Sequence, residues 1–333
     1  MMAKYRNHLP QLSDTFFITE GGVETTLIYE HNVELPYFAA FHVLKDEVGC
    51  ELIRNYAGSF CRIAQKHGIG FILESVTWRA NPDWMRKLGY SDQDVIDVNR
   101  KAIELLVDIR NKYETEKTQI VIDGCIGPRG DGYHSNVFMA IEEAQAYHAT
   151  QIDIFSKTNA DMVTGLTLTY PEEAIGIVLA AKAVGMPVAI SFTIETDGKL
   201  PTGQTLKEAI ELVDKATDST PIYYMANCVY PSHLQHALIP GGSWTARIRG
   251  IKGNASKKSH AELNNAKELD EGNPVEFGED TRALLDKLTT LNIIGGCCGT
   301  DLRHIEEVCK ACINVFDQSK HNAIQSTTSI KAD

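Results

Sequence analysis

Two cysteines stand side by side near the C-terminal end of the chain, in the segment LNIIGGCCGT. The pair, Cys297 and Cys298, directly follows an apolar run and lies between glycines. Neighbouring residues on a strand point to opposite faces, so an uninterrupted strand could not direct both sulfurs to one place. Gly295, Gly296 and Gly299 remove that restriction, because glycine allows a sharp turn that can aim both sulfurs at one ion.

A third cysteine, Cys228, ends another apolar run, PIYYMAN (221–227). If both runs are parallel strands of one barrel, their carboxyl ends lie on the same face and the three sulfurs converge. Three thiolates with a fourth position left open are typical of a catalytic zinc site, whereas a structural site closes with four protein ligands. A soft all-sulfur set also suits zinc better than magnesium or calcium.

The open fourth position of such a site would suit a substrate thiol. Zn²⁺ deprotonates a thiol that binds to it, which gives a nucleophile at neutral pH. The reaction that uses such a nucleophile is attack on an electrophilic methyl group, for which the protein mainly aligns the reacting atoms. Spacing alone leaves two alternatives open: cysteines buried as small apolar residues, and a vicinal redox pair.

Eight short apolar runs that resemble buried parallel strands alternate with amphipathic segments along the chain. The runs are FFITE (16–20), IGFILES (69–75), QIVIDGC (119–125), ADMVTGL (160–166), PVAISF (187–192), PIYYMAN (221–227), TARIRGI (245–251) and LNIIGG (291–296). This alternation predicts an α/β fold with right-handed crossovers. We expect a single-domain (βα)8 TIM barrel over residues 1–317, with an open sheet of similar strand count as the alternative.

Two polar segments lie apart from this alternation. The stretch 252–274 is expected to form a long loop or a partly helical excursion after the seventh strand. The tail 318–333 has no apolar period, so it is expected to be disordered or to act as an arm on a partner.

The composition limits the classes of function. The chain has 333 residues, of which 43% are hydrophobic and 23% charged, and a net charge of −12, which argues against nucleic-acid binding. No stretch approaches the length of a membrane span, and the N-terminus has no signal-peptide core. A cytoplasmic location is therefore the default, where thiols stay reduced. A monomer or a small homo-oligomer fits the length.

The cysteine motifs resemble those of a known family, the zinc-dependent homocysteine S-methyltransferases, which includes the betaine and S-methylmethionine enzymes. In that family one cysteine of an N-C motif and two of a G-G-C-C-G motif hold zinc in a (βα)8 barrel. Here these motifs are Asn227-Cys228 and Gly295–Thr300. The segments GGVETTL (21–27), ESVTWRAN (74–81) and GCIGPRGDGY (124–133) are also similar to the family's.

The resemblance implies a Zn²⁺ cofactor, held by Cys228, Cys297 and Cys298 as metal ligands and catalytic groups. It also implies small-molecule partners, a thiol acceptor and a methyl donor, with homocysteine as the default acceptor and methionine as its product. The acceptor head group would be bound by Glu20, Gly21, Gly22 and Thr77, and Asn227 would lie beside the metal or in the pocket.

Several residues depart from the family pattern. Glu20 stands where relatives carry Asp, Val76 where they carry Asn, and Arg79 where they carry a small residue. Leu166 stands at the position of a Glu that helps to bind the homocysteine amine. These changes leave open a different thiol or selenol acceptor, or a zinc- and thiol-binding barrel without turnover. The donor is also open among S-methylmethionine, S-adenosylmethionine and betaine.

Four further residues have competing interpretations. Lys252, which follows the seventh strand, would be the lysine of an aldolase, although a solvated loop lysine is the simpler interpretation. Cys309 and Cys312 lie three residues apart, so both thiols would pack from one helix face against the strands, with a second metal or redox site as the alternative. Cys125 ends the third strand and is expected to line the pocket.

A polar cluster at and beyond the end of the third strand includes Asp123, Arg129, Tyr133 and His134. These are either solvated loop residues or contacts to the methyl donor. A cationic donor would favour an aromatic wall, for which Trp78 is best placed because it follows Thr77.

Overall fold

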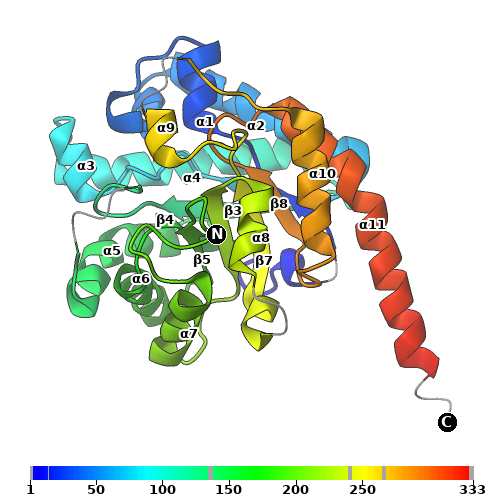
Figure 1. The fold of residues 1–333 in the computed structure, drawn as a ribbon. Helices are drawn as coiled ribbons and strands as arrows, with labels where there is room; N and C mark the ends of the chain where they lie inside the picture. Colours follow the sequence, from blue (N-terminus) through cyan, green and yellow to red (C-terminus); the bar gives the residue numbers. More distant parts are fainter. Residues whose placement is uncertain (1–2, 14, 134–137, 239–241, 265–267, 330–333) are drawn as a thin grey trace.

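A computed structural model of the chain shows eight parallel strands that close into a barrel (Figure 1). The structure describes residues 3–13, 15–133, 138–238, 242–264 and 268–329. The strands are β1 (Phe17–Ile18), β2 (Gly70–Glu74), β3 (Ile120–Ile126), β4 (Met162–Leu168), β5 (Val188–Thr193), β6 (Tyr224–Val229), β7 (Ile248–Gly253) and β8 (Ile293–Gly296). Pairing of Phe17 with both Gly70 of β2 and Ile293 of β8 closes the ring.

The closed ring confirms the (βα)8 TIM barrel and rules out the open sheet. Each strand overlaps its predicted run, but its ends shift by up to three residues. β6 and β7 shift most, and in β7 residues 245–247 belong to a 3-10 helix while the strand continues through Lys252 and Gly253. This shift places Lys252 inside the barrel wall.

Helices follow every strand and enclose the barrel (Figure 1). The longer ones are α2 (Glu47–His67), α4 (Asp92–Tyr113), α5 (Ile141–Ser156), α6 (Pro171–Ala183), α7 (Leu206–Thr217), α10 (Pro274–Leu285) and α11 (Leu302–Ser329). The shorter ones are α1 (Val23–Thr25), α3 (Pro82–Lys87), α8 (Pro231–Ala237) and α9 (His260–Asn264). Capping boxes at Ser91 and Thr205 define the starts of α4 and α7.

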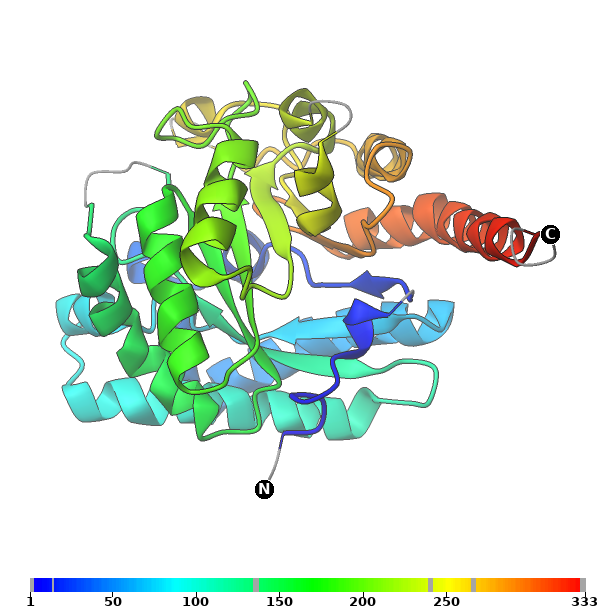
Figure 2. The same cartoon turned by 90° about the horizontal axis from the view of Figure 1, so that it is seen from below.

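Two apolar layers hold the barrel together. An inner cluster takes alternate residues of the strands, such as Ile72, Val121 and Met162, and residues between them pack outward against the helices. The inner layer also contacts Tyr5 and Leu9, so the N-terminal segment packs at the amino-terminal end of the strands. Figure 2 shows this segment on the opposite side from most of the loops that follow the strands.

The two polar segments differ in part from expectation. Within 252–274, the residues after β7 include the short helix α9, and α10 begins at Pro274. At the C-terminus, α11 continues to Ser329 and its last turns project away from the barrel in both views (Figures 1 and 2). Residues 318–329 are therefore helical, whereas the sequence predicted a disordered segment or an arm on a partner. Within the described part of the chain, every helix is too short or too polar to span a lipid bilayer.

Gly49 of α2 lies against the backbone of a neighbouring residue, so a side chain at this position would disturb the packing of the helix. A Cβ at Gly49 would lie 1.8 Å from the carbonyl oxygen of Val43, which cannot move without its chain. We expect Gly49→Ala to lower the free energy of unfolding by about 1–3 kcal/mol in urea titrations. Gly58→Ala on the same helix is the control, because its Cβ would meet only the Tyr113 side chain, 2.6 Å away. Equal losses in the two variants would contradict this account.

Candidate metal centre and its cavity

Three thiols converge at the carboxyl ends of β6 and β8. The Sγ atoms of Cys228, Cys297 and Cys298 all lie within 4.8 Å of one another, and those of Cys228 and Cys297 are 3.0 Å apart. Tetrahedral Zn–S bonds of about 2.3 Å place sulfurs about 3.8 Å apart, so this group needs only small adjustments to hold zinc. Among the described residues it is the one cluster of three or more potential metal ligands.

The turn after β8 brings both adjacent cysteines to this face. Gly299 adopts a φ of +77°, which side chains disfavour, and the chain reverses there. The Thr300 amide and hydroxyl both donate to the Cys297 carbonyl, at 3.1 and 2.6 Å. The loop after β1 packs closely on this turn, because a Cβ at Gly22 would lie 2.5 Å from the same carbonyl oxygen.

Cys228 is held in a conformation that non-glycine residues rarely adopt. Its φ is +55°, and the β6–β7 register shifts at this point. The Cys228 carbonyl accepts hydrogen bonds from Asn254 Nδ2 at 3.0 Å and His260 Nε2 at 2.7 Å. His260 Nδ1 donates to Glu195 at 2.9 Å, and this bond raises the pKa of His260 although burial opposes it. These contacts stabilise Cys228 in its strained conformation.

Asn227 connects this ligand to the neighbouring strands. Its Oδ1 accepts from the Ser191 hydroxyl at 2.6 Å and the Thr167 amide at 3.2 Å. Its Nδ2 donates to Thr167 Oγ1 at 3.0 Å and to Cys228 Sγ at 3.1 Å. Asn227 therefore orients the sulfur from behind rather than lining the cavity.

Replacing Asn227 by alanine should weaken zinc binding without unfolding the barrel. Mutation of a residue that orients a metal ligand typically lowers metal affinity by about 10–100-fold. We expect a loss of zinc affinity of that size in the Asn227→Ala variant, measured by competition with a chelator. Asn99→Ala is the matched control, because Asn99 is equally buried and bonds to Ala80 and Val95 away from the cysteines. A similar zinc affinity in both variants would exclude an orienting role for Asn227.

Tyr133 covers the cysteines from the loop after β3. Its hydroxyl lies 3.5 Å from the sulfurs of both Cys228 and Cys298, and its ring packs against His260 at 4.8 Å. Hydrogen bonds from the thiols of Cys228 and Cys297 lower the pKa of Cys298 well below its usual range. The sequence placed Tyr133 among residues that are either solvated or in contact with the methyl donor, and nothing in its spacing shows that this loop folds over β6 and β8.

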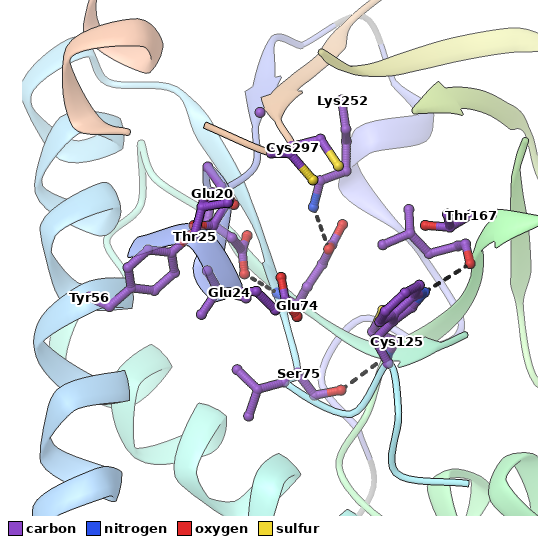
Figure 3. A pocket seen from close by; sticks show the side chains of 18 of the residues that line it. Glu20, Glu24, Thr25, Tyr56, Glu74, Ser75, Cys125, Thr167, Lys252 and Cys297 are labelled. Carbon is purple, nitrogen blue, oxygen red and sulfur yellow. Dashed lines mark hydrogen bonds and ion pairs between the residues drawn. The ribbon is translucent and has the colours of Figure 1, made fainter. Parts of the chain in front are cut away.

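A cavity opens between the cysteines and the loop after β1 (Figure 3). Of the residues predicted to bind the acceptor, Glu20, Gly21 and Gly22 line it. Thr77 is fully buried and donates to the Cys125 carbonyl at 2.7 Å, so its hydroxyl is engaged outside the cavity. Other lining residues include Glu24, Tyr56, Glu74, Val76, Trp78, Cys125, Tyr133, Leu166, Thr167 and Lys252.

Carboxylates dominate the electrostatics of this cavity. Burial, with a further contribution from Glu74, raises the pKa of Glu20 to about 8. Burial also raises the pKa of Glu24 to about 7. Lys252 forms a buried ion pair with Glu74 (Figure 3). The sequence did not show that Glu24, Glu74 and Lys252 belong to one site. Glu74 and Lys252 are 178 residues apart in the chain, so only the folded barrel brings them together.

The ion pair argues against both interpretations of Lys252. The solvated-loop interpretation is wrong, because the side chain is buried and only about 4% of the residue is exposed. Burial alone would lower the pKa of Lys252, but Glu74 and Glu20 outweigh it and raise the pKa. A Schiff-base lysine needs a neutral amine near pH 7, so the arrangement disfavours an aldolase.

A second hollow lies on the outer side of the cysteines and shares Cys298 with the first. Its wall combines aromatic and acidic side chains: Tyr29, Phe38, Trp78, Tyr133, Glu24, Asp131, Glu268 and Asp270. Arg79 also lies there, stacked between Trp78 and Trp84 with its Cζ 3.9 Å from each ring centroid. The predicted position of Trp78 beside the site agrees with this arrangement.

The remaining residues singled out from the sequence do not belong to the group of three cysteines. Cys309 and Cys312 are buried in α11, and burial raises the pKa of both thiols, as expected for packing residues. Cys125 lines the inner cavity. Arg129 is engaged by Asp83 and Glu143 on the surface, and His134 lies outside the described residues.

Comparisons with known proteins agree with the cysteine motifs. A family model described as homocysteine S-methyltransferase matches residues 17–312. Homocysteine S-methyltransferase 1 of Arabidopsis thaliana is 22% identical over 85% of this chain and 89% of its own length. Homocysteine S-methyltransferase 2 of the same plant is 20% identical over 73% of this chain and 79% of its own.

Solved structures show the same fold at low sequence identity. The metallated form of the Escherichia coli homocysteine methyltransferase MmuM superposes with a TM-score of 0.70 at 17% identity. The match covers 90% of this chain and 96% of that one.

Proposed function

Because the chain belongs to the homocysteine S-methyltransferase family, we propose that this methyltransferase moves a methyl group from a sulfonium or ammonium donor to the sulfur of a thiol bound at zinc. Homocysteine is the default acceptor, and methionine would be its product. The observation that carries the proposal is the group of Cys228, Cys297 and Cys298, whose sulfurs lie within 4.8 Å of one another beside a cavity.

The three cysteines fit zinc by their chemistry as well as by their spacing. All three donors are sulfur, and three protein ligands leave a fourth position for a substrate. Zinc in this position would lower the pKa of an acceptor thiol, so that a thiolate is available at neutral pH. Cys297 and Cys298 are partly exposed, which keeps one side of the group accessible to a substrate.

The chain's own residues would orient the ligands and the reacting groups. Asn227 fixes the direction of Cys228, and Asn254 and His260 hold its main chain. The acceptor sulfur attacks the methyl carbon, a new S–C bond forms, and the donor's bond to that carbon breaks with its electron pair on the leaving atom. Such a displacement depends mainly on alignment of the three atoms.

The outer hollow supports a cationic donor. Aromatic faces and carboxylates both stabilise a sulfonium or quaternary ammonium group, and this hollow offers both next to Cys298. S-methylmethionine, S-adenosylmethionine and betaine all carry such a group and are the donors to compare.

A zinc- and thiol-binding barrel without turnover is the second candidate. Leu166 favours it, because this apolar side chain lines the cavity where the family carries a Glu. A cytoplasmic location and a monomer or small homo-oligomer complete the proposal.

A direct assay separates the two candidates. Zinc-loaded protein would be incubated with homocysteine and each donor in turn, and methionine would be measured by mass spectrometry. Methionine formation that depends on protein and zinc supports the proposal. Zinc and thiol binding without product from any donor, with other thiols also tested as acceptors, would favour the binding barrel.

A further inference from the structure

A buried arginine stands in the wall of the outer hollow, and the proposed transfer step does not use it. Arg79 lies in the loop after β2, and only about 4% of the residue is exposed. Burial lowers the pKa of Arg79 to about 10, so the guanidinium stays charged at neutral pH. A buried charge is costly unless its donors are satisfied, so the unused donors of Arg79 indicate what it can bind.

Two tryptophans fix the orientation of this guanidinium. It lies between the indole rings of Trp78 and Trp84, with its Cζ 3.9 Å from each ring centroid. Trp78 is itself held in place, because its Nε1 donates to the Leu166 carbonyl at 3.3 Å and its carbonyl accepts from the Gly127 amide at 3.1 Å. Rings on both faces leave only the edges of the guanidinium open to a ligand.

One edge of the guanidinium has no acceptor within hydrogen-bond distance among the described residues. Nη1 donates to the Gly130 carbonyl at 2.8 Å. Nε is buried without a partner in the described part of the chain, and Nη2 lies 4.0 Å from Asp131 Oδ2, which is too far for a hydrogen bond. Nε and Nη2 form one edge of the guanidinium, and such an edge binds a carboxylate through two parallel hydrogen bonds.

Arg79 gives the outer hollow a single position for an anionic group. It is the only lysine or arginine among the described residues that line the hollow. The acidic residues there have other partners: Asp270 pairs with Lys258 at 2.8 Å, and Asp131 accepts from the Tyr133 amide at 2.8 Å. A carboxylate elsewhere in the hollow would meet like charges, whereas at Arg79 it would satisfy the unused edge.

The position of Arg79 suits the far end of a donor. Tyr133 and Cys298 line both the outer hollow and the inner cavity, so they mark the place where the two meet. The transferred methyl group must pass there if the acceptor thiol binds on the inner side. Trp78 also lines both spaces, and Arg79 is stacked on its ring but lines only the outer hollow. A donor with its onium group at this junction can therefore place a second charged group at Arg79.

We propose that Arg79 binds a carboxylate of the methyl donor and so orients the donor's onium group toward Cys298. This inference rests on the proposed function and adds a binding residue to it. The donor class is an onium carboxylate, a small molecule that combines a sulfonium or quaternary ammonium group with a carboxylate. A donor without the carboxylate leaves the Nε and Nη2 edge unsatisfied and is not aligned for transfer.

Isothermal titration of the zinc-loaded full chain measures this preference without any acceptor. The probes are two matched pairs, S-methylmethionine with its carboxamide and betaine with betaine amide. The members of each pair share the onium group and nearly the same shape, and they differ in the charge of the second group. We expect the carboxylate of at least one pair to bind at least about tenfold more tightly than its amide, the effect of one charge-assisted contact.

Three variants test whether Arg79 causes the preference. Arg79→Gln should reduce the ratio of the two affinities to nearly one, because the charged edge is gone. Arg79→Lys keeps the charge and the apolar stem but loses the planar edge, so it should retain only part of the ratio. Arg86→Gln is the matched control, because Arg86 is exposed on α3 and is absent from the described lining of the hollow. It should keep the ratio of the parent protein.

Each ratio compares two ligands on one protein, so a general loss of stability in a variant affects both measurements alike. Equal affinities for acid and amide in both pairs, binding of none of the four probes, or an undiminished ratio in either Arg79 variant would overturn the role of Arg79. Methyl transfer from the same two donors to homocysteine tests the proposed function separately. Product with a carboxylate preference that is independent of Arg79 contradicts only this inference. A preference that depends on Arg79, without product from any donor or acceptor thiol, supports the carboxylate site and contradicts methyl transfer.

Discussion

Cys297→Ala is expected to abolish both zinc retention and methyl transfer. Removing one of three thiolates leaves two protein ligands, too few for a catalytic zinc site. When both proteins are purified under reducing conditions, the parent protein should contain about one zinc per chain and the Cys297→Ala variant almost none. Metal analysis by mass spectrometry, beside the methyl-transfer assay, measures both effects.

Cys312→Ala provides the matched control. Cys312 is buried in α11, on the outside of the barrel, and belongs to no group of potential metal ligands among the described residues. This variant should lose about 1 kcal/mol of stability from a small cavity and retain its zinc. Full zinc content in Cys297→Ala, or its loss in Cys312→Ala, would contradict the assignment of the ligands.

Lys252→Met should be strongly destabilising because it leaves buried carboxylates without a cation. Breaking a buried ion pair by removing one partner typically costs about 3–5 kcal/mol, and Lys252 and Glu74 are both largely buried. We expect a loss of that size in the free energy of unfolding at pH 8. The double variant Lys252→Met/Glu74→Gln should recover most of it, since the unpaired charge is then gone.

The destabilisation should also depend on pH. The pKa of Glu20 in the folded protein is raised to about 8, compared with about 4.3 in an unfolded chain. Between these values the folded state binds more protons, so stability falls as the pH rises. Without Lys252 this dependence should become steeper, and the deficit of Lys252→Met should be larger at pH 8 than at pH 5. Urea unfolding at both pH values measures it, and a deficit independent of pH would exclude this cause.

Local pattern was sufficient to predict the fold. Each of the eight apolar runs overlaps its strand, because residues buried on both faces of a parallel sheet must be apolar wherever they occur. Alternation with amphipathic helices then allows few topologies, of which the closed barrel is one. The strand ends were less certain, since pairing with neighbours decides where a strand stops, as at Lys252.

The cysteine group was accessible from sequence for a similar reason. Cys228 and the pair Cys297 and Cys298 follow apolar runs directly, and the barrel brings all strand ends to one face. Glycine at position 299 indicated the turn that allows two adjacent sulfurs to converge. Residue type and position along the chain were therefore enough to predict where these thiols meet.

What surrounds the cysteines was decided only by tertiary structure. The sequence alone was enough to predict the barrel, the three thiols and the face on which they lie, because each depends on local pattern and on a topology that few alternatives share. It could not determine that Tyr133 covers the sulfurs or that Lys252 pairs with Glu74. Nor could it determine that Glu20 keeps an oxygen without a partner among the residues that the structure describes. These facts depend on side-chain directions across loops and strands far apart in the chain, where charge and burial are set by the neighbours and not by the residue itself.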